Sequence, residues 1–249
     1  MKLRRLPEID LANIAALDAW TKKIRLSRHQ KGSGFWSYDP ARNQLPDILN
    51  PEPVLPLDLV APSDAVILER VAAACKNKVQ KKSCVEVTKL TIKWSRENIG
   101  RSAEKMFPSL GIGSLGRVRY WTNVVFEFKA RLTVAYFDHR REHGLTARGR
   151  KVAFSLMHQQ IRVSDPEFSD ADLMIVQFKQ APGEERGYQI YLASELKGPL
   201  FSFDELQEMI SETYEIWAKL ESLKKGASKS SKKRDDKTAD MFEKKPKTG

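Results

Sequence analysis

One stretch of the chain, residues 115–163, is rich in arginine, a residue type that is well suited to binding phosphate. Residues 115–163 carry ten lysines and arginines against three acidic residues. Arginine can bind a phosphate through two parallel hydrogen bonds, which makes it a better partner for a polyanion than lysine. This stretch predicts a non-catalytic nucleic-acid-binding surface, with DNA as the favoured ligand. The phosphate contacts are assigned to Arg117, Arg119, Arg140, Arg141, Arg148, Arg150 and Lys151.

Three of these cations fall at the start of a predicted helix. Thr146 is a suitable cap, and Arg148, Arg150 and Lys151 follow it. Backbone N–H groups at a helix start attract anions, whereas cations placed there oppose the helix dipole. This conflict favours a phosphate site. The alternative is a solvated basic turn, or one that pairs with acidic residues later in the chain.

A second arrangement would suit a metal-dependent nuclease or another nucleic-acid enzyme. Asp165 and Asp172 could hold Mg²⁺, and Lys179 could lie beside the attacking water. However, Asp172 and Lys179 are seven positions apart in one expected strand, so their side chains point to opposite faces. A solvated acidic turn is the simpler interpretation. No catalytic residue is therefore assigned, and the balance favours a protein that is not an enzyme.

Metal and redox chemistry find little support. His139, Glu142 and His143 match the inverted zinc-protease pattern, but adjacent arginines would repel a metal ion and no third ligand is evident. Cys75 and Cys84 stand in no metal-binding pattern, and a redox pair between them is the minor alternative to a core role. No metal and no cofactor are predicted.

The charge is sorted into blocks along the chain. Residues 1–163 have a net charge of +14, residues 164–223 of −9 and residues 224–249 of +6. The acidic block ends in a predicted helix whose outward stripe can bind a basic protein, which gives a third interpretation, an interaction subunit. That stripe consists of Glu205, Glu208, Glu212 and Glu215. The stripe could instead form ion pairs with the arginines of residues 115–163.

The last block is a lysine- and serine-rich tail. Lys232, Lys233 and Arg234 would extend the reach of a nucleic-acid binder as a mobile polycation. No apolar run reaches the roughly 18–20 residues that cross a bilayer, and no secretory signal is visible, so no membrane partner is expected. The expected location is cytoplasmic, nucleoid-associated in a bacterium or nuclear in a eukaryote.

Apolar spacing predicts the elements that would position these residues. Steps of three and four predict helices over 9–28, 64–78, 115–142 and 146–161, of which the last two form a central helical hairpin. Two extended runs, 172–180 and 188–194, predict a late β-hairpin, and Ser202 caps a closing amphipathic helix to about Leu220. Weaker patterns suggest a strand within 85–94 and a short helix over 97–106.

The sequence therefore predicts a mainly helical α+β fold. Its expected parts are an N-terminal helix in 1–30, a proline-rich connector or arm in 31–63, a main globular domain in 64–223 and a disordered basic tail in 224–249.

Overall fold

The structure is a computed structural model that describes residues 3, 5–30, 37–49, 61–112, 116–140, 142–181, 188–194 and 198–242. The side chains of residues 30, 116 and 224–242 are not described. Helix accounts for 54% and strand for 21%, which confirms the mainly helical α+β class. None of the helices in the described ranges has the length and apolar character needed to span a bilayer.

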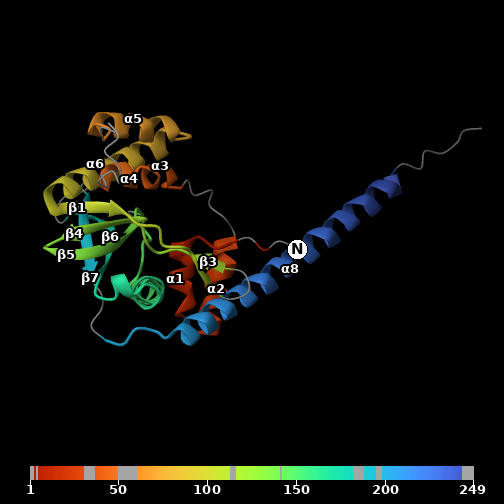
Figure 1. Cartoon of the computed structure of the whole chain (residues 1–249). Coiled ribbons are helices and arrows are strands. Elements are labelled where there is room, and N and C mark those ends of the chain that lie inside the picture. The colour runs from red at the N-terminus through yellow and green to blue at the C-terminus, as the bar shows by residue number, and fades with distance from the viewer. Residues whose placement is uncertain are drawn as a thin grey trace, which may run out of the picture.

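A five-stranded mixed sheet forms the centre of the molecule (Figure 1). Its strands are, in spatial order, β1 (Ile99–Glu104), β4 (Val124–Phe128), β5 (Arg131–Asp138), β6 (Asp172–Gln180) and β7 (Tyr188–Ser194). β5 and β6 pair in parallel, and the other neighbours are antiparallel. The parallel pair is linked by helix α7 (Ala147–Met157). A separate ribbon pairs β2 (Leu110–Ile112) with β3 (Gly116–Val118).

Helices cover both faces of this sheet (Figure 1). One face is covered by α7, α1 (Glu8–Ala15), α2 (Ala19–Gln30) and α8 (Phe203–Phe242). The other is covered by α3 (Asp39–Arg42), α4 (Leu45–Leu49), α5 (Asp64–Ala74) and α6 (Lys78–Asn98). A π-helical turn (His158–Val163) and a 3₁₀ turn (Pro166–Phe168) connect α7 to β6.

The predicted central helix over 115–142 is wrong, because this stretch forms β3, β4 and β5. The β4–β5 turn has Lys129 and Ala130 at positive φ, 52° and 60°, as a tight two-residue hairpin requires. Both faces of β5 are covered: Val134 packs in the core beneath α1 and α7, whereas Phe137 packs against Trp94 of α6. A strand buried on both faces shows no alternation of polar and apolar residues, so its spacing mimics a helix.

Two neighbouring assignments are also wrong. The predicted strand within 85–94 lies inside α6, and the predicted short helix over 97–106 is mainly β1. The long N-terminal helix is two helices, with a break after Ala15. Residues 37–49 of the predicted connector form α3 and α4, and residues 31–36 and 50–60 lie outside the described residues.

The elements with local start signals are confirmed. Ser63 caps α5, and Thr146 caps α7 by accepting from the backbone N–H of Gly149 at 3.1 Å. The hairpin of β6 and β7 has the predicted ranges. Ser202 and Glu205 cap α8 reciprocally, each side-chain oxygen accepting from the other residue's backbone N–H. α8 continues to Phe242, so the disorder predicted for residues 224–249 and the division into domains stay predictions.

Candidate protein-interaction surface

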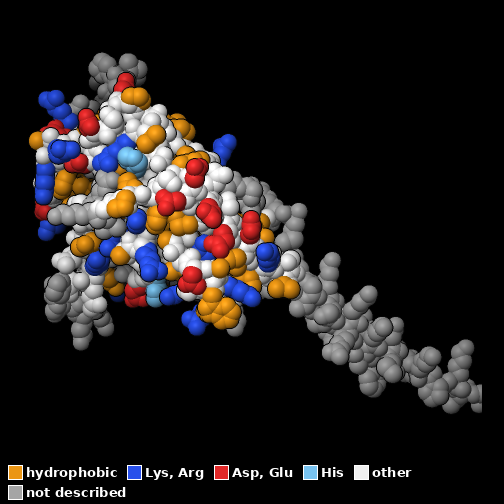
Figure 2. Space-filling model, turned by 90° about the horizontal axis from the view of Figure 1, so that it is seen from below, with side chains coloured by type: hydrophobic (Ala, Val, Ile, Leu, Met, Phe, Trp, Pro, Cys, Tyr) orange, Lys and Arg blue, Asp and Glu red, His pale blue; other side chains and the backbone are white. Residues whose placement is uncertain are grey.

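The first part of α8 is amphipathic, with an acidic outer face. Leu206, Ile210 and Trp217 are buried in the core that α8 shares with α1 and α7. The opposite side exposes Glu205, Glu208 and Glu215. In Figure 2, acidic side chains gather on the underside of the molecule, where α8 lies. The predicted stripe therefore exists as a surface, and its carboxylates form no ion pair with the described arginines of residues 115–163.

Glu212, the fourth stripe residue, holds α8 to α2. It pairs with Lys22, whose side chain is only 1% exposed, and the Lys22 ammonium also donates to the Met209 carbonyl oxygen at 3.4 Å. A buried ammonium needs such partners, because removal from water disfavours its charge. The Glu212 side chain remains 43% exposed, so it contributes to the acidic surface as well as to the helix contact.

One exposed aromatic residue on α2 was not predicted from the sequence. The apolar spacing of the predicted helix over 9–28 places Trp20 on its inward face, but this side chain is 70% exposed. The reason is a second helix start at Asp18, whose carboxylate accepts from the Thr21 backbone N–H at 2.9 Å and from its hydroxyl at 2.6 Å. This cap resets the helical register, and the Asp18–Thr21 spacing was the available signal. We name Trp20, Glu205, Glu208, Glu212 and Glu215 the α2–α8 surface.

Arg140 and Arg119 are engaged inside the fold. Arg140 donates two hydrogen bonds to the Asp10 carboxylate, at 2.7 and 2.9 Å, and so ties the end of β5 to α1. Arg119 donates to the Trp121 carbonyl oxygen at 3.3 Å, and burial lowers the pKa of its guanidinium. These two side chains stabilise the fold.

The proposed anion site at the start of α7 is filled by the protein's own oxygen atoms. The Asn13 side-chain oxygen accepts from the Thr146 backbone N–H at 2.9 Å, and the Asp138 carboxylate accepts from that of Leu145 at 2.6 Å. Arg150 donates to the Gln177 side-chain oxygen at 3.1 Å and to the Leu145 carbonyl oxygen at 3.3 Å. These internal acceptors take up the Leu145 and Thr146 N–H groups and one terminal nitrogen of Arg150, whereas the buried Nε of Arg150 has no partner in the described part of the chain.

The remaining predicted cations are dispersed. The Lys151 ammonium lies 4.2 Å from the centre of the Phe201 ring, whereas Arg117 and Arg148 are exposed. Arg141 lies outside the described residues, as do the side chains of Lys232, Lys233 and Arg234.

The residues of the nuclease alternative are not brought together. Asp165 pairs with Lys105 at 2.9 Å, and Asp172 with Arg131 at 2.8 Å. Lys179 lies at the other end of β6, with its ammonium 3.4 Å from the centre of the Tyr191 ring. Across the described ranges, no group of three histidine, cysteine or acidic side chains could hold a metal ion.

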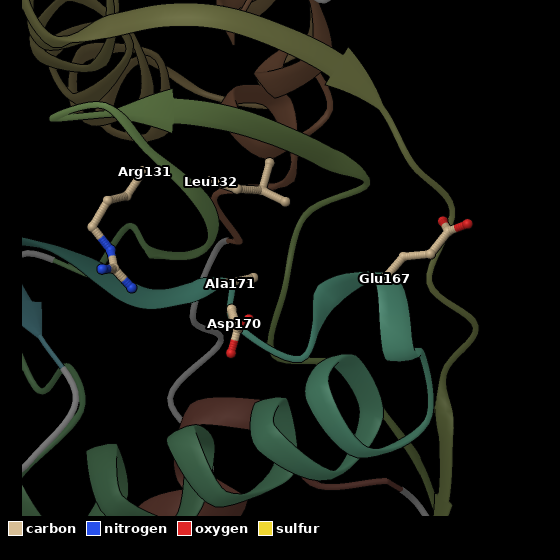
Figure 3. Close-up of a pocket in the computed structure, with 5 residues that line it drawn as sticks. All are labelled: Arg131, Leu132, Glu167, Asp170 and Ala171. Carbon is tan, nitrogen blue, oxygen red and sulfur yellow. The ribbon is translucent and has the colours of Figure 1, made fainter.

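An open hollow lies beside these residues at the start of β6 (Figure 3). It is lined by Arg131, Leu132, Glu167, Asp170 and Ala171. The Glu167 carboxylate points away from Asp170, so the two acids do not converge on a common point (Figure 3). The hollow offers no paired carboxylates for a metal or for acid–base chemistry.

His139 of the zinc-like pattern is a core residue. It is 2% exposed and stacks with Tyr38, Phe137 and Phe178, at ring-centre distances of 6.2, 6.0 and 5.6 Å. Burial lowers its pKa to about 3, so the ring is neutral at physiological pH. Aromatic packing accounts for this histidine.

Comparison with known proteins gives one family and one curated relative. The family model described as "Sliding clamp-binding bacterial toxin SocB" matches residues 9–226. The chain is also 31% identical over 217 residues to the "DNA replication inhibitor toxin SocB" of Caulobacter vibrioides (strain NA1000 / CB15N), which covers 87% of this chain and 90% of the relative. No solved structure matches the chain.

These comparisons overturn the predicted nucleic-acid binding. The family description specifies a protein partner, and the structure gives the physical reason for the error: several of the arginines complete internal contacts. The DNA-binding interpretation is therefore wrong, and the interaction-subunit alternative agrees better with the comparisons. Since the family model matches most of its length, the chain belongs to the SocB family of sliding clamp-binding bacterial toxins.

Proposed function

We propose that this protein binds the bacterial DNA sliding clamp and thereby inhibits DNA replication. The observation that carries the proposal is the family match over residues 9–226, supported by the relative described as a replication inhibitor. A protein bound to the clamp excludes other proteins from the surface that it covers, which is a direct route to inhibition. The proposal places the protein in the bacterial cytoplasm, where the chromosome is replicated.

We further propose the α2–α8 surface as the contact. It combines an exposed tryptophan, the kind of side chain that supplies much of the binding energy in protein interfaces, with a row of carboxylates. The carboxylates fit lysines and arginines on the partner. Charge complementarity of this kind speeds association and sets the orientation of two proteins at an interface.

The test measures binding of the purified full-length chain to an immobilised bacterial sliding clamp. Two variants change the surface: Trp20→Ala, and Glu208→Lys combined with Glu215→Lys. Each should weaken binding by about tenfold or more, because one loses an aromatic anchor and the other places like charges opposite each other. In a reconstituted clamp-dependent primer-extension reaction, the wild type should reduce the product and both variants should reduce it less.

The matched control combines Glu69→Lys with Glu127→Lys, which makes the same charge change at exposed positions on α5 and β4. It should bind like the wild type. If the wild type does not bind the clamp, the proposed function is wrong. If the wild type binds and both surface variants bind equally well, the function stands and the α2–α8 surface is not the contact.

A further inference from the structure

The two cysteines of the chain are brought together by the α5–α6 turn. Cys75 is the C-terminal cap of α5, and Cys84 lies about two turns into α6. Cys84 is buried in an apolar cluster with Val71 and Phe178, and Cys75 packs against the same cluster, where its sulfur helps to raise the pKa of the Cys84 thiol. Since the sequence has only these two cysteines, each has the other as its single intramolecular partner for a disulfide.

A defined turn keeps the two thiols adjacent. The Asn77 side chain accepts from the Gln80 backbone N–H at 2.9 Å, and the Gln80 side-chain oxygen accepts from the Lys76 backbone N–H at 2.8 Å. Gln80 also donates to the Ser37 carbonyl oxygen at 2.8 Å, which fastens the turn to the segment before α3. The approach of the cysteines is therefore fixed by hydrogen bonds on both sides of the turn.

The two thiols differ in access. Cys75 is partly exposed, and its Sγ donates to the Val71 carbonyl oxygen at 3.1 Å. Cys84 is fully buried, and burial together with the adjacent sulfur raises the pKa of its thiol to about 12. An oxidant from solution therefore meets Cys75 first, and Cys84 reacts second.

We propose that Cys75 and Cys84 are a modification site, an oxidisable pair that forms a reversible intramolecular disulfide and fastens α5 to α6. With glutathione disulfide as oxidant, the Cys75 thiolate attacks one glutathione sulfur, forms a mixed disulfide and releases one glutathione thiolate. Cys84 then loses its proton and attacks the Cys75 sulfur, which forms the protein disulfide and releases the second glutathione. Two electrons pass from the protein to the oxidant, and the two thiol protons end on the two glutathiones.

The second step should be slow, because the thiolate is the nucleophile and the raised pKa of Cys84 keeps that thiolate scarce at neutral pH. This inference does not rest on the proposed function. α5 and α6 cover the face of the sheet opposite to α8 (Figure 1), so clamp binding and disulfide formation can fail independently.

The experiment treats the folded, full-length chain with graded ratios of oxidised to reduced glutathione, blocks remaining thiols by alkylation and measures the intact mass. We expect a monomer that has lost two hydrogens and accepts no alkyl group, with a peptide linking Cys75 to Cys84. The oxidised protein should unfold at a temperature higher by roughly 5 °C, because the cross-link restricts the unfolded chain. Added reductant should reverse both changes.

Cys75→Ser is the matched variant, since it keeps the buried Cys84 and replaces a partly exposed residue. It should show neither the loss of two hydrogens nor the rise in unfolding temperature. If the wild type yields only a glutathione adduct on Cys75 or cross-linked dimers, the proposal is wrong. The same holds if both thiols stay alkylatable at every ratio while the protein remains folded.

Discussion

Two adjacent residues at the end of β5 have pKa values that burial shifts in opposite directions. The carboxyl of Asp138 is fully buried, and desolvation raises its pKa, although it accepts from Leu145 and Gln177. His139 is buried among aromatic rings, and desolvation lowers its pKa to about 3. Burial disfavours the charged form in both cases, which means the negative form of an acid and the positive form of an imidazole.

The shift of His139 predicts a loss of stability in acid. The unfolded chain binds a proton at an ordinary histidine pKa of 6.5, whereas the folded protein does so only near 3. Stability should therefore fall as pH drops through this window, by about 2–3 kcal/mol between pH 6.5 and 4.5. Chemical denaturation at several pH values measures this slope.

His139→Phe is the comparison, because a phenyl ring keeps the stacking with Phe137 and Phe178 and cannot be protonated. The variant should lack that part of the slope. The raised pKa of Asp138 has the opposite effect, since its contribution to the stability of the fold falls as pH rises above 3.8. Asp138 is present in both proteins, so this contribution cancels when their pH profiles are subtracted. Identical pH profiles for the two proteins would contradict the assignment.

At the scale of elements, the contact between α1 and α7 explains why the predicted anion site at the start of α7 is occupied by a side chain of the protein itself. Asn13 of α1 accepts from both the backbone N–H and the hydroxyl of Thr146, and its amide donates to the Gly144 carbonyl oxygen at 3.0 Å. A side chain from α1 thus occupies the position that a phosphate would take. The junction requires a residue without a side chain at position 149, because a Cβ built there would lie 2.1 Å from the Asn13 side-chain oxygen.

Gly149→Ala should therefore destabilise the protein by about 2 kcal/mol, since the added methyl group displaces the Asn13 side chain and breaks its hydrogen bonds with Thr146. Thermal unfolding measures this loss. Gly111→Ala is the control, because a Cβ at that position meets nothing within 4 Å, and it should change stability by less than about 0.5 kcal/mol. In a double-mutant cycle with Asn13→Ala, the two costs should not add, because that change removes the clashing oxygen. Simple additivity would contradict this explanation.

At the scale of the whole molecule, α8 closes one face of the fold and then projects beyond it (Figure 1). Among the side chains of α8 that the structure describes, Leu206, Ile210, Tyr214 and Trp217 are buried in the core. The family match ends at residue 226. The α8 side chains that are seen to fill the core therefore lie within the residues that the family model matches.

A chain truncated after Leu223 should keep the unfolding temperature of the full protein within about 2 °C and should bind the clamp with unchanged affinity. A chain truncated after Ser202 is the contrasting case, because it exposes the core that Leu206 and Trp217 fill, and it should not fold cooperatively. A clear drop in stability or affinity after the shorter truncation would show that residues 224–249 contribute to the body or to the partner contact.

Features that depend on contacts within a few residues were predictable from the amino-acid sequence. Side-chain caps at Ser63, Thr146 and Ser202 act on the next turn, so the starts of α5, α7 and α8 were predictable. The same is true of the β6–β7 hairpin and of the acidic stripe on α8. The Asp18 cap was equally local, and it would have revealed the exposure of Trp20.

The contacts of each cationic side chain depend on how distant segments pack together. Arg140 binds Asp10, which is 130 positions away in the sequence, and Arg150 binds Gln177, which is 27 positions away. No spacing pattern in the sequence predicts such pairs. Likewise, helices cover both faces of the sheet that contains β4 and β5. These strands therefore lack the alternation of polar and apolar residues by which a strand is recognised in a sequence. Residue types set the charge of a segment, but packing between distant segments determines whether that charge remains on the surface.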